Sequence, residues 1–233
     1  MKRQRLGQHY LVDTQVIREV VEFARIQPSE RVLEIGTGRG ALTGELVRLG
    51  AGFIGYEIDD DNYEATCEAV RGTKAEIVHG DAFASDPKFD VLVTSLPYSE
   101  SATFVRWLSS REFSRAIAVL QKDFVEKITA APGDREYRGI SAVSQIAFGV
   151  RMLGKVARAA FDPQPRVDSV IASFVPRKKM AEGEVSGVIR LFSLRRRQVD
   201  VALAKLGMER RRSFGRRRVV SLAPDEVHEI CKQ

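Results

Sequence analysis

A glycine-rich segment directly after a short apolar run constrains the fold of this chain most strongly. The run Arg31–Ile35 (RVLEI) is typical of a buried β-strand, and glycines follow at positions 36, 38 and 40. Residues Ala41–Leu49 then place leucines on one helical side, and Gly50 ends that pattern. Glycines let the backbone turn tightly, and the helix N-terminus behind them offers unpaired N–H groups. The segment therefore predicts a ligand site at a strand–helix turn.

Strands and helices are expected to alternate over the first three quarters of the chain. Further strands are predicted at Phe53–Ile58, Glu76–His79, Phe89–Thr94 and Arg115–Leu120, and helices at Thr14–Arg25, Asn62–Val70 and Ala102–Leu108. Two late strands, Gly154–Ala160 and Ser169–Val175, flank a proline-rich turn and suggest a closing hairpin. This alternation predicts an α/β fold with βαβ units on a mostly parallel sheet.

Positive charge gathers in the C-terminal quarter. Residues 177–233 hold 15 Lys and Arg against 7 Asp and Glu, whereas residues 1–176 hold 22 against 24. We therefore expect a first domain over 1–176 and a basic, helical RNA-binding domain over 177–233. Arginine binds phosphate with a two-pronged fork, so arginine runs are typical of nucleic-acid binding, although a solvated helix face is the alternative. The candidate residues form three triplets: Arg195, Arg196 and Arg197; Arg210, Arg211 and Arg212; Arg216, Arg217 and Arg218.

Composition excludes several protein classes. Apolar residues make up 44% of the 233-residue chain and charged residues 29%, which is typical of a globular protein. Apolar stretches fall short of the ~18–20 residues of a membrane span, and the start has no secretory signal. Cys67 and Cys231 form neither a disulfide framework nor a zinc signature, so no metal is expected. We expect a cytoplasmic protein without membrane partners, acting as a monomer.

Glu34 and Asp81 distinguish two ligands for the glycine segment, and Glu57 suits the ribose of either one. The pattern fits G-x-G-x-x-G/A, so a dinucleotide such as NAD is a competitor. Glu57 ends the next strand, where a carboxylate can accept hydrogen bonds from both hydroxyls of a ribose. Glu34 precedes the glycines, where its charge suits a cationic ligand better than a pyrophosphate, and Asp81 follows a third strand, placed to accept from an adenine amino group or to cap a helix. These positions favour S-adenosylmethionine over NAD.

The loop after the fourth predicted strand is the candidate catalytic segment. It reads Ser95-Leu96-Pro97-Tyr98, and ligands of open α/β sheets bind at this side of the strands. A rigid turn with an exposed tyrosine can stack a flat base, which is worth ~1–3 kcal/mol. The Leu96 carbonyl can accept from an exocyclic amine. A plain turn with a partly buried ring is the alternative.

With these residues assembled, the chain resembles the ribosomal RNA adenine N6,N6-dimethyltransferase family, which includes the erythromycin-resistance methylases. The resemblance runs over nearly the whole chain. Its motifs are the opening Leu6–Leu11 (LGQHYL, with His9 in the usual Asn place), VLEIGTGRGALT at Val32–Thr43, GDA at Gly80–Ala82, LPY at Leu96–Tyr98, QKDFVE at Gln121–Glu126, FDPQPRVDS at Phe161–Ser169 and the segment Phe192–Arg197.

The resemblance implies a Rossmann-like class I methyltransferase with a small helical C-terminal domain and S-adenosylmethionine as the donor. It implies two adjacent adenines near the 3′ end of small-subunit rRNA as the substrate, within a pre-ribosomal small subunit. Tyr98 would stack on one face of the target base and Phe161 on the other. The residues that it assigns to the donor are Gln8, His9, Leu11, Glu34, Gly36, Gly38, Glu57, Ile58, Asp81, Ala82 and Ser95.

Ser95 departs from the family pattern, which has Asn or Asp at this position. A serine hydroxyl is shorter and a weaker acceptor than an asparagine carbonyl. The loss of one positioned group commonly costs ~3 kcal/mol, or about a hundredfold in rate. Slower transfer, transfer of a single methyl group and loss of activity are the outcomes that Ser95 leaves open. Because the Leu96 carbonyl remains, we expect the activity to be retained. The alternative is an RNA-binding ribosome-assembly factor that retains the methyltransferase fold without the activity.

Overall fold

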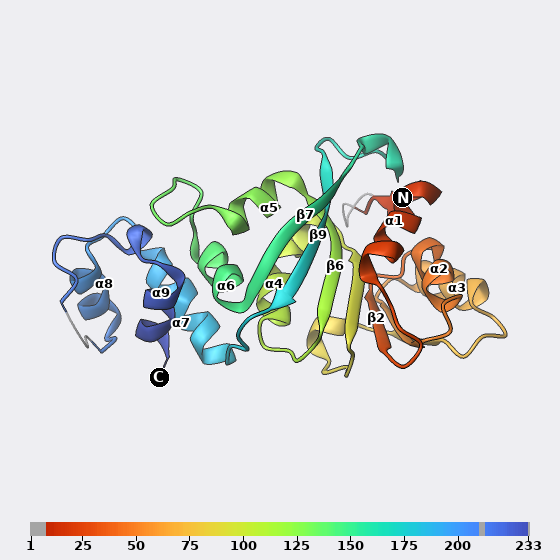
Figure 1. Cartoon of the computed structure of the whole chain (residues 1–233), viewed down its shortest axis with the longest axis horizontal. Helices are drawn as coiled ribbons and strands as arrows, with labels where there is room; N and C mark the ends of the chain where they lie inside the picture. Colours follow the sequence, from red (N-terminus) through yellow and green to blue (C-terminus); the bar gives the residue numbers. More distant parts are fainter. Residues whose placement is uncertain (1–7, 210–212, 233) are drawn as a thin grey trace. The chain divides into compact units, whose positions relative to one another are not determined.

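The computed structural model describes residues 8–209 and 213–232, and its centre is a seven-stranded sheet in the order β4-β3-β2-β5-β6-β9-β7 (Figure 1). Strands β2 to β6 pair in parallel, and β9 runs antiparallel to β6. The expectation of a mostly parallel sheet is confirmed. The strands are β2 (Arg31–Ile35), β3 (Gly52–Glu57), β4 (Glu76–His79), β5 (Val91–Ser95), β6 (Arg115–Gln121), β7 (Phe148–Val156) and β9 (Ser169–Pro176).

A separate two-stranded sheet ties the start of the described chain to a late segment. Its strands are β1 (Tyr10–Leu11) and β8 (Phe161–Asp162), which pair antiparallel with Leu11 opposite Phe161. Both of these side chains are buried in the same apolar cluster as strand residues of the large sheet. The N-terminal segment is thereby held beside the sheet, a placement that the local sequence pattern does not indicate.

Helix α1 (Thr14–Ala24) covers part of the large sheet. The Asp13 side chain caps its start by accepting hydrogen bonds from the backbone N–H groups of Gln15 and Val16. Its buried face packs on β5 and β6 and contacts α2 (Ala41–Val47). Helix α3 (Asp60–Ala69) packs on β3 and β4. These helices bury the apolar residues of the strands and leave the carboxyl ends of β2, β3 and β5 open to a pocket.

The described chain divides into two compact units that interleave in sequence. One unit contains residues 1–101, 112–122 and 151–175, and the other contains 102–111, 123–150 and 176–233. In the second unit, α6, α7 and α9 pack together and α8 contacts α7. The helices concerned are α4 (Ser101–Leu108), α5 (Lys122–Thr129), α6 (Gly139–Ala147), α7 (Glu182–Ser193), α8 (Val199–Leu206) and α9 (Pro224–Cys231). The functional division at residue 176 stays a prediction.

One predicted strand differs from its observed bounds by more than two residues. The sequence pattern placed a late strand at Gly154–Ala160, but β7 runs over Phe148–Val156, and Arg158–Ala160 is a short 3₁₀ turn. Strand β7 lies at the edge of the sheet and leaves most of its side chains partly exposed, so it lacks a continuous apolar run. The prediction that the two late strands are neighbours is confirmed, because β7 and β9 are adjacent in the sheet.

The described helices include none that is long and apolar enough to span a membrane. Within the same described residues, no group of three or more histidine, cysteine or acidic side chains is placed to hold a metal ion.

Candidate donor-binding and catalytic site

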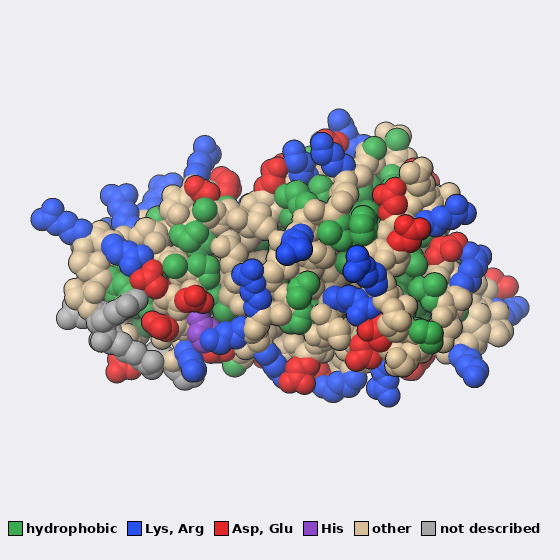
Figure 2. All heavy atoms as spheres, in the orientation of Figure 1, with side chains coloured by type: hydrophobic (Ala, Val, Ile, Leu, Met, Phe, Trp, Pro, Cys, Tyr) green, Lys and Arg blue, Asp and Glu red, His purple; other side chains and the backbone are tan. Residues whose placement is uncertain are grey.

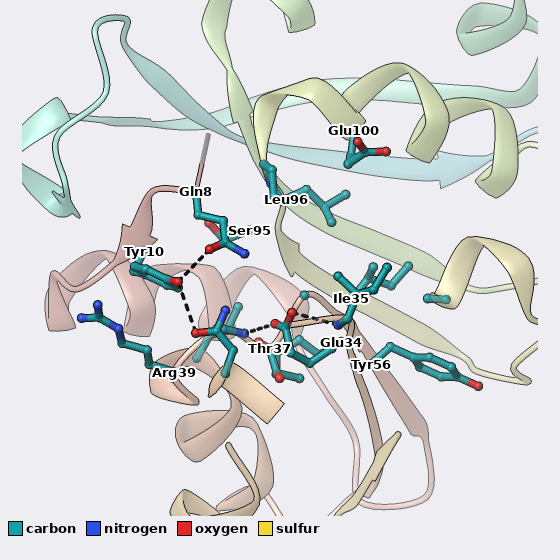
Figure 3. Close-up of a pocket in the computed structure, with 18 of the residues that line it drawn as sticks. Gln8, Tyr10, Glu34, Ile35, Thr37, Arg39, Tyr56, Ser95, Leu96 and Glu100 are labelled. Atoms are coloured by element: carbon teal, nitrogen blue, oxygen red, sulfur yellow. Dashed lines mark hydrogen bonds between the residues drawn. The ribbon is translucent and has the colours of Figure 1, made fainter. Parts of the chain in front are cut away.

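A pocket of about 330 Å³ lies at the carboxyl ends of β2, β3 and β5 (Figure 3). This volume is in the range of small-molecule sites. All of its lining residues belong to one compact unit. The structure gathers most of the predicted site residues here: Gln8, His9, Leu11, Glu34, Gly36, Gly38, Glu57, Ile58, Asp81, Ala82, Ser95, Leu96 and Pro97.

The glycine segment has a backbone that requires glycine. Gly36, Gly38 and Gly40 have φ angles of 74°, 56° and 81°, in the left-handed region. A Cβ atom at Gly40 would lie 2.9 Å from the Cβ of Ala69 in α3. The tight approach of the loop to α3 and the start of α2 thus explains the glycine spacing seen in the sequence.

Glu57 is the most constrained carboxylate of the pocket. It is 4% exposed, and its Oε2 accepts from the Gly38 N–H at 2.8 Å. Its Oε1 accepts from the backbone N–H groups of Ile58 at 2.9 Å and Asp59 at 3.0 Å. Three N–H groups therefore hold the carboxylate at the end of β3, where the sequence predicted a ribose contact.

Glu34 is buried at the base of the pocket, 1% exposed. Burial, together with the nearby Glu57 carboxylate, raises the pKa of Glu34 to about 8, against a lowering by a hydrogen bond with Thr43. Its Oε2 has no hydrogen-bond partner among the described residues. Burial thus favours the protonated form of this carboxyl group when no cation lies beside it. A cationic group beside Oε2 would favour the charged form.

The adenine side of the pocket combines a polar and an apolar group. Asp81 Oδ1 accepts from the Phe83 N–H at 2.8 Å and caps a short 3₁₀ helix, so the capping role considered for it is confirmed. Ile58 is 64% exposed although it lines the pocket, and it offers an apolar surface to a flat ring. Ala82 is buried beside it in the lining.

A ligand with a cationic end, a ribose and an adenine fits these groups. The unpartnered Glu34 Oε2 is an acceptor suited to an ammonium group. The buried amide of Asn62, whose Nδ2 has no partner among the described residues, lies in the same lining. A cationic group beside Glu34 would favour the charged carboxylate, whereas a pyrophosphate would oppose it, so the pocket chemistry agrees with S-adenosylmethionine.

The candidate catalytic loop leaves β5 at Ser95, the last residue of the strand. Ser95, Leu96 and Pro97 line the pocket. The hydroxyl of the half-buried Tyr98 lies 2.6 Å from Ser169 Oγ at the start of β9, so this contact holds the tyrosine ring. Burial, and to a lesser extent the Asp168 carboxylate, raise the pKa of Tyr98, which keeps this hydroxyl neutral. The ring of His9 lies 5.6 Å from that of Tyr98, between centroids.

Phe161 packs in the apolar core. It is 4% exposed and belongs to the same cluster as Leu11, its partner in the β1–β8 pairing. The pocket lining includes neither Phe161 nor Tyr98. Their stacking on the target base stays a prediction.

Several residues of the pocket went unnoticed in the sequence. Tyr10 contacts the glycine segment, because the guanidinium carbon of Arg39 lies 4.4 Å from its ring centroid (Figure 3). Asn62 is 5% exposed and lines the pocket from α3, and Glu100 lines it after the catalytic loop. Tyr10 stands between two residues of a recognised motif, which was an available signal. Asn62 and Glu100 carry no comparable local signal.

Two arginine triplets lie side by side in the second unit. The Arg195 carbonyl accepts from the Val220 N–H at 3.0 Å, and the Arg197 carbonyl accepts from the Val219 N–H at 3.1 Å. Gln198 and Arg218 form an antiparallel bridge. These contacts bring the triplets 195–197 and 216–218 together, although about twenty residues separate them. The predicted triplet 210–212 lies outside the described residues, as do Leu6 and Gly7 of the opening motif.

The arginines of these triplets differ in their surroundings. Arg217 forms a two-pronged ion pair with Glu226, at 2.6 and 2.7 Å, and donates to the Ser221 carbonyl at 2.9 Å. Partial burial, then the guanidinium groups of Arg138 and Arg196, lower the pKa of Arg195. Figure 2 shows basic side chains projecting from the face drawn over α8 and α9, with acidic ones among them. Arg217 thus contributes to structure, whereas Arg195 lies in a cluster of like charge.

The fold and the pocket define a class I, S-adenosylmethionine-dependent methyltransferase. Among solved structures, a dimethyladenosine transferase from Plasmodium falciparum superposes with a TM-score of 0.79 at 24% identity, covering 95% of this chain and 96% of that chain. The 23S rRNA methyltransferase ErmE superposes with a TM-score of 0.69 at 26% identity, covering 96% and 100%. The expected fold class and the methyl donor are thereby confirmed.

The chain belongs to the ribosomal RNA adenine dimethylase family, whose model matches residues 1–230. It is 34% identical over 240 residues to the probable ribosomal RNA small subunit methyltransferase A of Pyrococcus abyssi, covering 97% of this chain and 89% of that protein. It is 31% identical over 235 residues to a probable dimethyladenosine transferase of Caenorhabditis elegans, covering 97% and 73%. The protein is therefore an S-adenosylmethionine-dependent rRNA adenine dimethyltransferase, and the reading as an inactive assembly factor is not favoured.

Proposed function

We propose that this enzyme dimethylates two adjacent adenines near the 3′ end of small-subunit rRNA, within a pre-ribosomal small subunit, and that it acts in the cytoplasm as a monomer. The observation that carries the proposal is a pocket that joins the donor residues at β2 and β3 to Ser95, Leu96 and Pro97 at the end of β5, directly before Tyr98 in the chain. The small-subunit substrate is supported by the name of the relative from Pyrococcus abyssi.

The donor is held by polar groups at three strand ends. Glu57 accepts from the ribose hydroxyls, and Asp81 from the adenine amino group, beside the apolar surface of Ile58 and Ala82. Glu34 Oε2 accepts from the ammonium group of the methionine end, with Gln8 and the glycine loop around it. His9 and Leu11 close the same side. S-adenosylmethionine, when bound, supplies a methyl group on a positively charged sulfur, which is already a strong electrophile.

The acceptor base is positioned by the loop after β5. The Tyr98 ring stacks on the adenine, and its bond to Ser169 holds the ring in place. The Leu96 carbonyl and the Ser95 hydroxyl accept hydrogen bonds from the adenine amine, which stabilises the positive charge that develops on the nitrogen. No strong base is required, because the proton leaves to solvent after transfer. Alignment of the amine with the methyl group then supplies much of the rate.

The base must leave its stack or lie in an RNA loop to reach this pocket. We infer that residues 177–233 hold the rRNA backbone while residues 1–176 carry out the transfer. Arg195, Arg196 and Arg197, together with Arg216 and Arg218, supply the phosphate contacts, and Arg217 supports them through Glu226. Like charges held together, as around Arg195, are stabilised by a bound polyanion.

The test is a methylation assay with isotopically labelled donor. The pure protein is incubated with immature small ribosomal subunits that lack adenine dimethylation and, separately, with large-subunit particles. The product is mapped by nuclease digestion and mass spectrometry. Dimethyladenosine at two neighbouring positions of small-subunit rRNA is expected. Product only on large-subunit rRNA would contradict the proposed substrate and would match the activity named for ErmE.

Two variants separate the roles of the pocket and the arginines. Tyr98→Ala should abolish transfer while leaving RNA binding within about twofold, because the ring lies at the catalytic loop. Replacement of Arg195 and Arg196 by Gln should weaken RNA binding and reduce the slope of log affinity against log salt by roughly 1 to 2. An unchanged salt slope would contradict the role of the triplets.

A further inference from the structure

Tyr10 lines the pocket and makes both aromatic and polar contacts there, and the proposed function gives it no role. Its strand β1 pairs with β8, so its backbone is fixed beside the pocket. A Cβ atom placed on Gly38 would lie 3.2 Å from Tyr10 Cδ1, so the ring lies directly against the glycine segment. The guanidinium carbon of Arg39 lies 4.4 Å from the centroid of this ring. The aromatic ring thus packs on the loop that holds the donor.

The Tyr10 hydroxyl adds a polar contact to this packing. It lies 2.9 Å from Gln8 Oε1 and 3.2 Å from Asn62 Oδ1, and both amide side chains line the pocket (Figure 3). A hydroxyl carries one proton and can donate to only one of these oxygens. Asn62 is 5% exposed, and its Nδ2 has no partner among the described residues.

Turning one of the two amides resolves this conflict, and the unpartnered Nδ2 of the buried Asn62 favours turning that amide. The oxygen and nitrogen of an amide are assigned from their hydrogen-bond partners. If the Asn62 amide is turned, its nitrogen donates to the Tyr10 oxygen, and Tyr10 donates to Gln8 Oε1. This direction leaves the Gln8 NH₂ group, rather than its oxygen, for a ligand. An N–H donor at this place suits a carboxylate.

We propose that Tyr10 is a positioning residue for the methyl donor, whose hydroxyl orients the Gln8 amide so that Nε2 donates to the methionine carboxylate of S-adenosylmethionine. This inference rests on the proposed role of Gln8 at the methionine end. It makes Tyr10 specific for the amino-acid part of the ligand, because Glu57, Ile58 and Asp81 hold the adenosine part without it.

The test compares two ligands by titration calorimetry on the full chain. S-adenosylhomocysteine carries the amino-acid part, whereas 5′-methylthioadenosine lacks it. Tyr10→Phe removes only the hydroxyl and should weaken S-adenosylhomocysteine binding by about three- to tenfold, the effect of one hydrogen bond. Binding of 5′-methylthioadenosine should not change. Tyr63→Phe is the matched control, because the Tyr63 ring stacks on His79 outside the pocket lining, and it should leave both affinities unchanged.

A double-mutant cycle with Gln8→Ala tests whether the Tyr10 hydroxyl affects ligand binding through the Gln8 side chain. In the Gln8→Ala background, Tyr10→Phe should cause no further loss. Equal weakening of both ligands by Tyr10→Phe, or a full further loss in the Gln8→Ala background, would overturn the inference. If Gln8→Ala weakens S-adenosylhomocysteine binding and Tyr10→Phe does not, the inference on Tyr10 fails while the proposed donor site stands. If the wild-type chain binds neither ligand, the proposed donor site itself fails.

Discussion

Replacement of Glu57 by Gln tests whether this carboxylate stabilises the glycine segment of the pocket. Glu57 accepts three backbone hydrogen bonds, one on Oε2 from Gly38 and two on Oε1 from Ile58 and Asp59. A glutamine must turn its NH₂ group toward one of these sides, where a donor would face a donor. If the NH₂ group faces Gly38, one hydrogen bond is lost, whereas two are lost if it faces Ile58 and Asp59. The first orientation therefore costs less free energy. Glu57→Gln therefore loses one charge-assisted bond, worth about 1.5–3 kcal/mol, and weakens the other two.

The expected loss is about 2–4 kcal/mol in the free energy of unfolding of the ligand-free protein, or roughly 5–15 °C in melting temperature. Circular dichroism during heating and in urea measures both quantities. Glu45→Gln is the matched control, because Glu45 pairs with Arg48 on an exposed part of α2, and it should change stability by less than about 0.5 kcal/mol. If Glu57→Gln melts with the wild type, the carboxylate does not organise the glycine segment and the reasoning is refuted.

Three further results are expected. Burial raises the pKa of Glu34 to about 8 from its ordinary value of 4.5, so the unfolded chain loses this proton at lower pH than the folded protein does. The free energy of unfolding should therefore fall as pH rises from about 4.5 to about 8. In urea titrations, Glu34→Gln should lack this pH-dependent fall. Arg217→Ala should lower the free energy of unfolding by about 1 kcal/mol through loss of the Glu226 pair and weaken RNA binding little, whereas Arg218→Ala should do the reverse in melting and filter-binding assays. Ser95→Asn should raise the single-turnover methylation rate up to about a hundredfold, and a rate equal to wild type would show that the serine hydroxyl and the Leu96 carbonyl suffice.

The sequence by itself determined which segments form the parallel strands and which acidic residues lie at their ends. The predicted strand ends, Ile35, Ile58 and Thr94, agree with the observed ends within one residue, because parallel strands buried on both faces need short apolar runs. A parallel sheet brings these carboxyl ends to one edge, so the sequence predicts that Glu34, Glu57 and Asp81 line one site.

Tertiary structure decided what depends on contacts between distant segments. The pairing of β1 with β8 buries Phe161 and places Tyr10 against Gly38, because hydrogen bonding across about 150 residues leaves no periodic signal in either segment. Burial decided the protonation of Glu34, since the cost of removing a charge from water depends on what surrounds it. The ion pair with Glu226 gives Arg217 a structural role that its neighbours Arg216 and Arg218 are not expected to share, although all three are arginines. Residue type and local spacing thus determined which groups the site contains, and long-range packing decided which of them face the ligand.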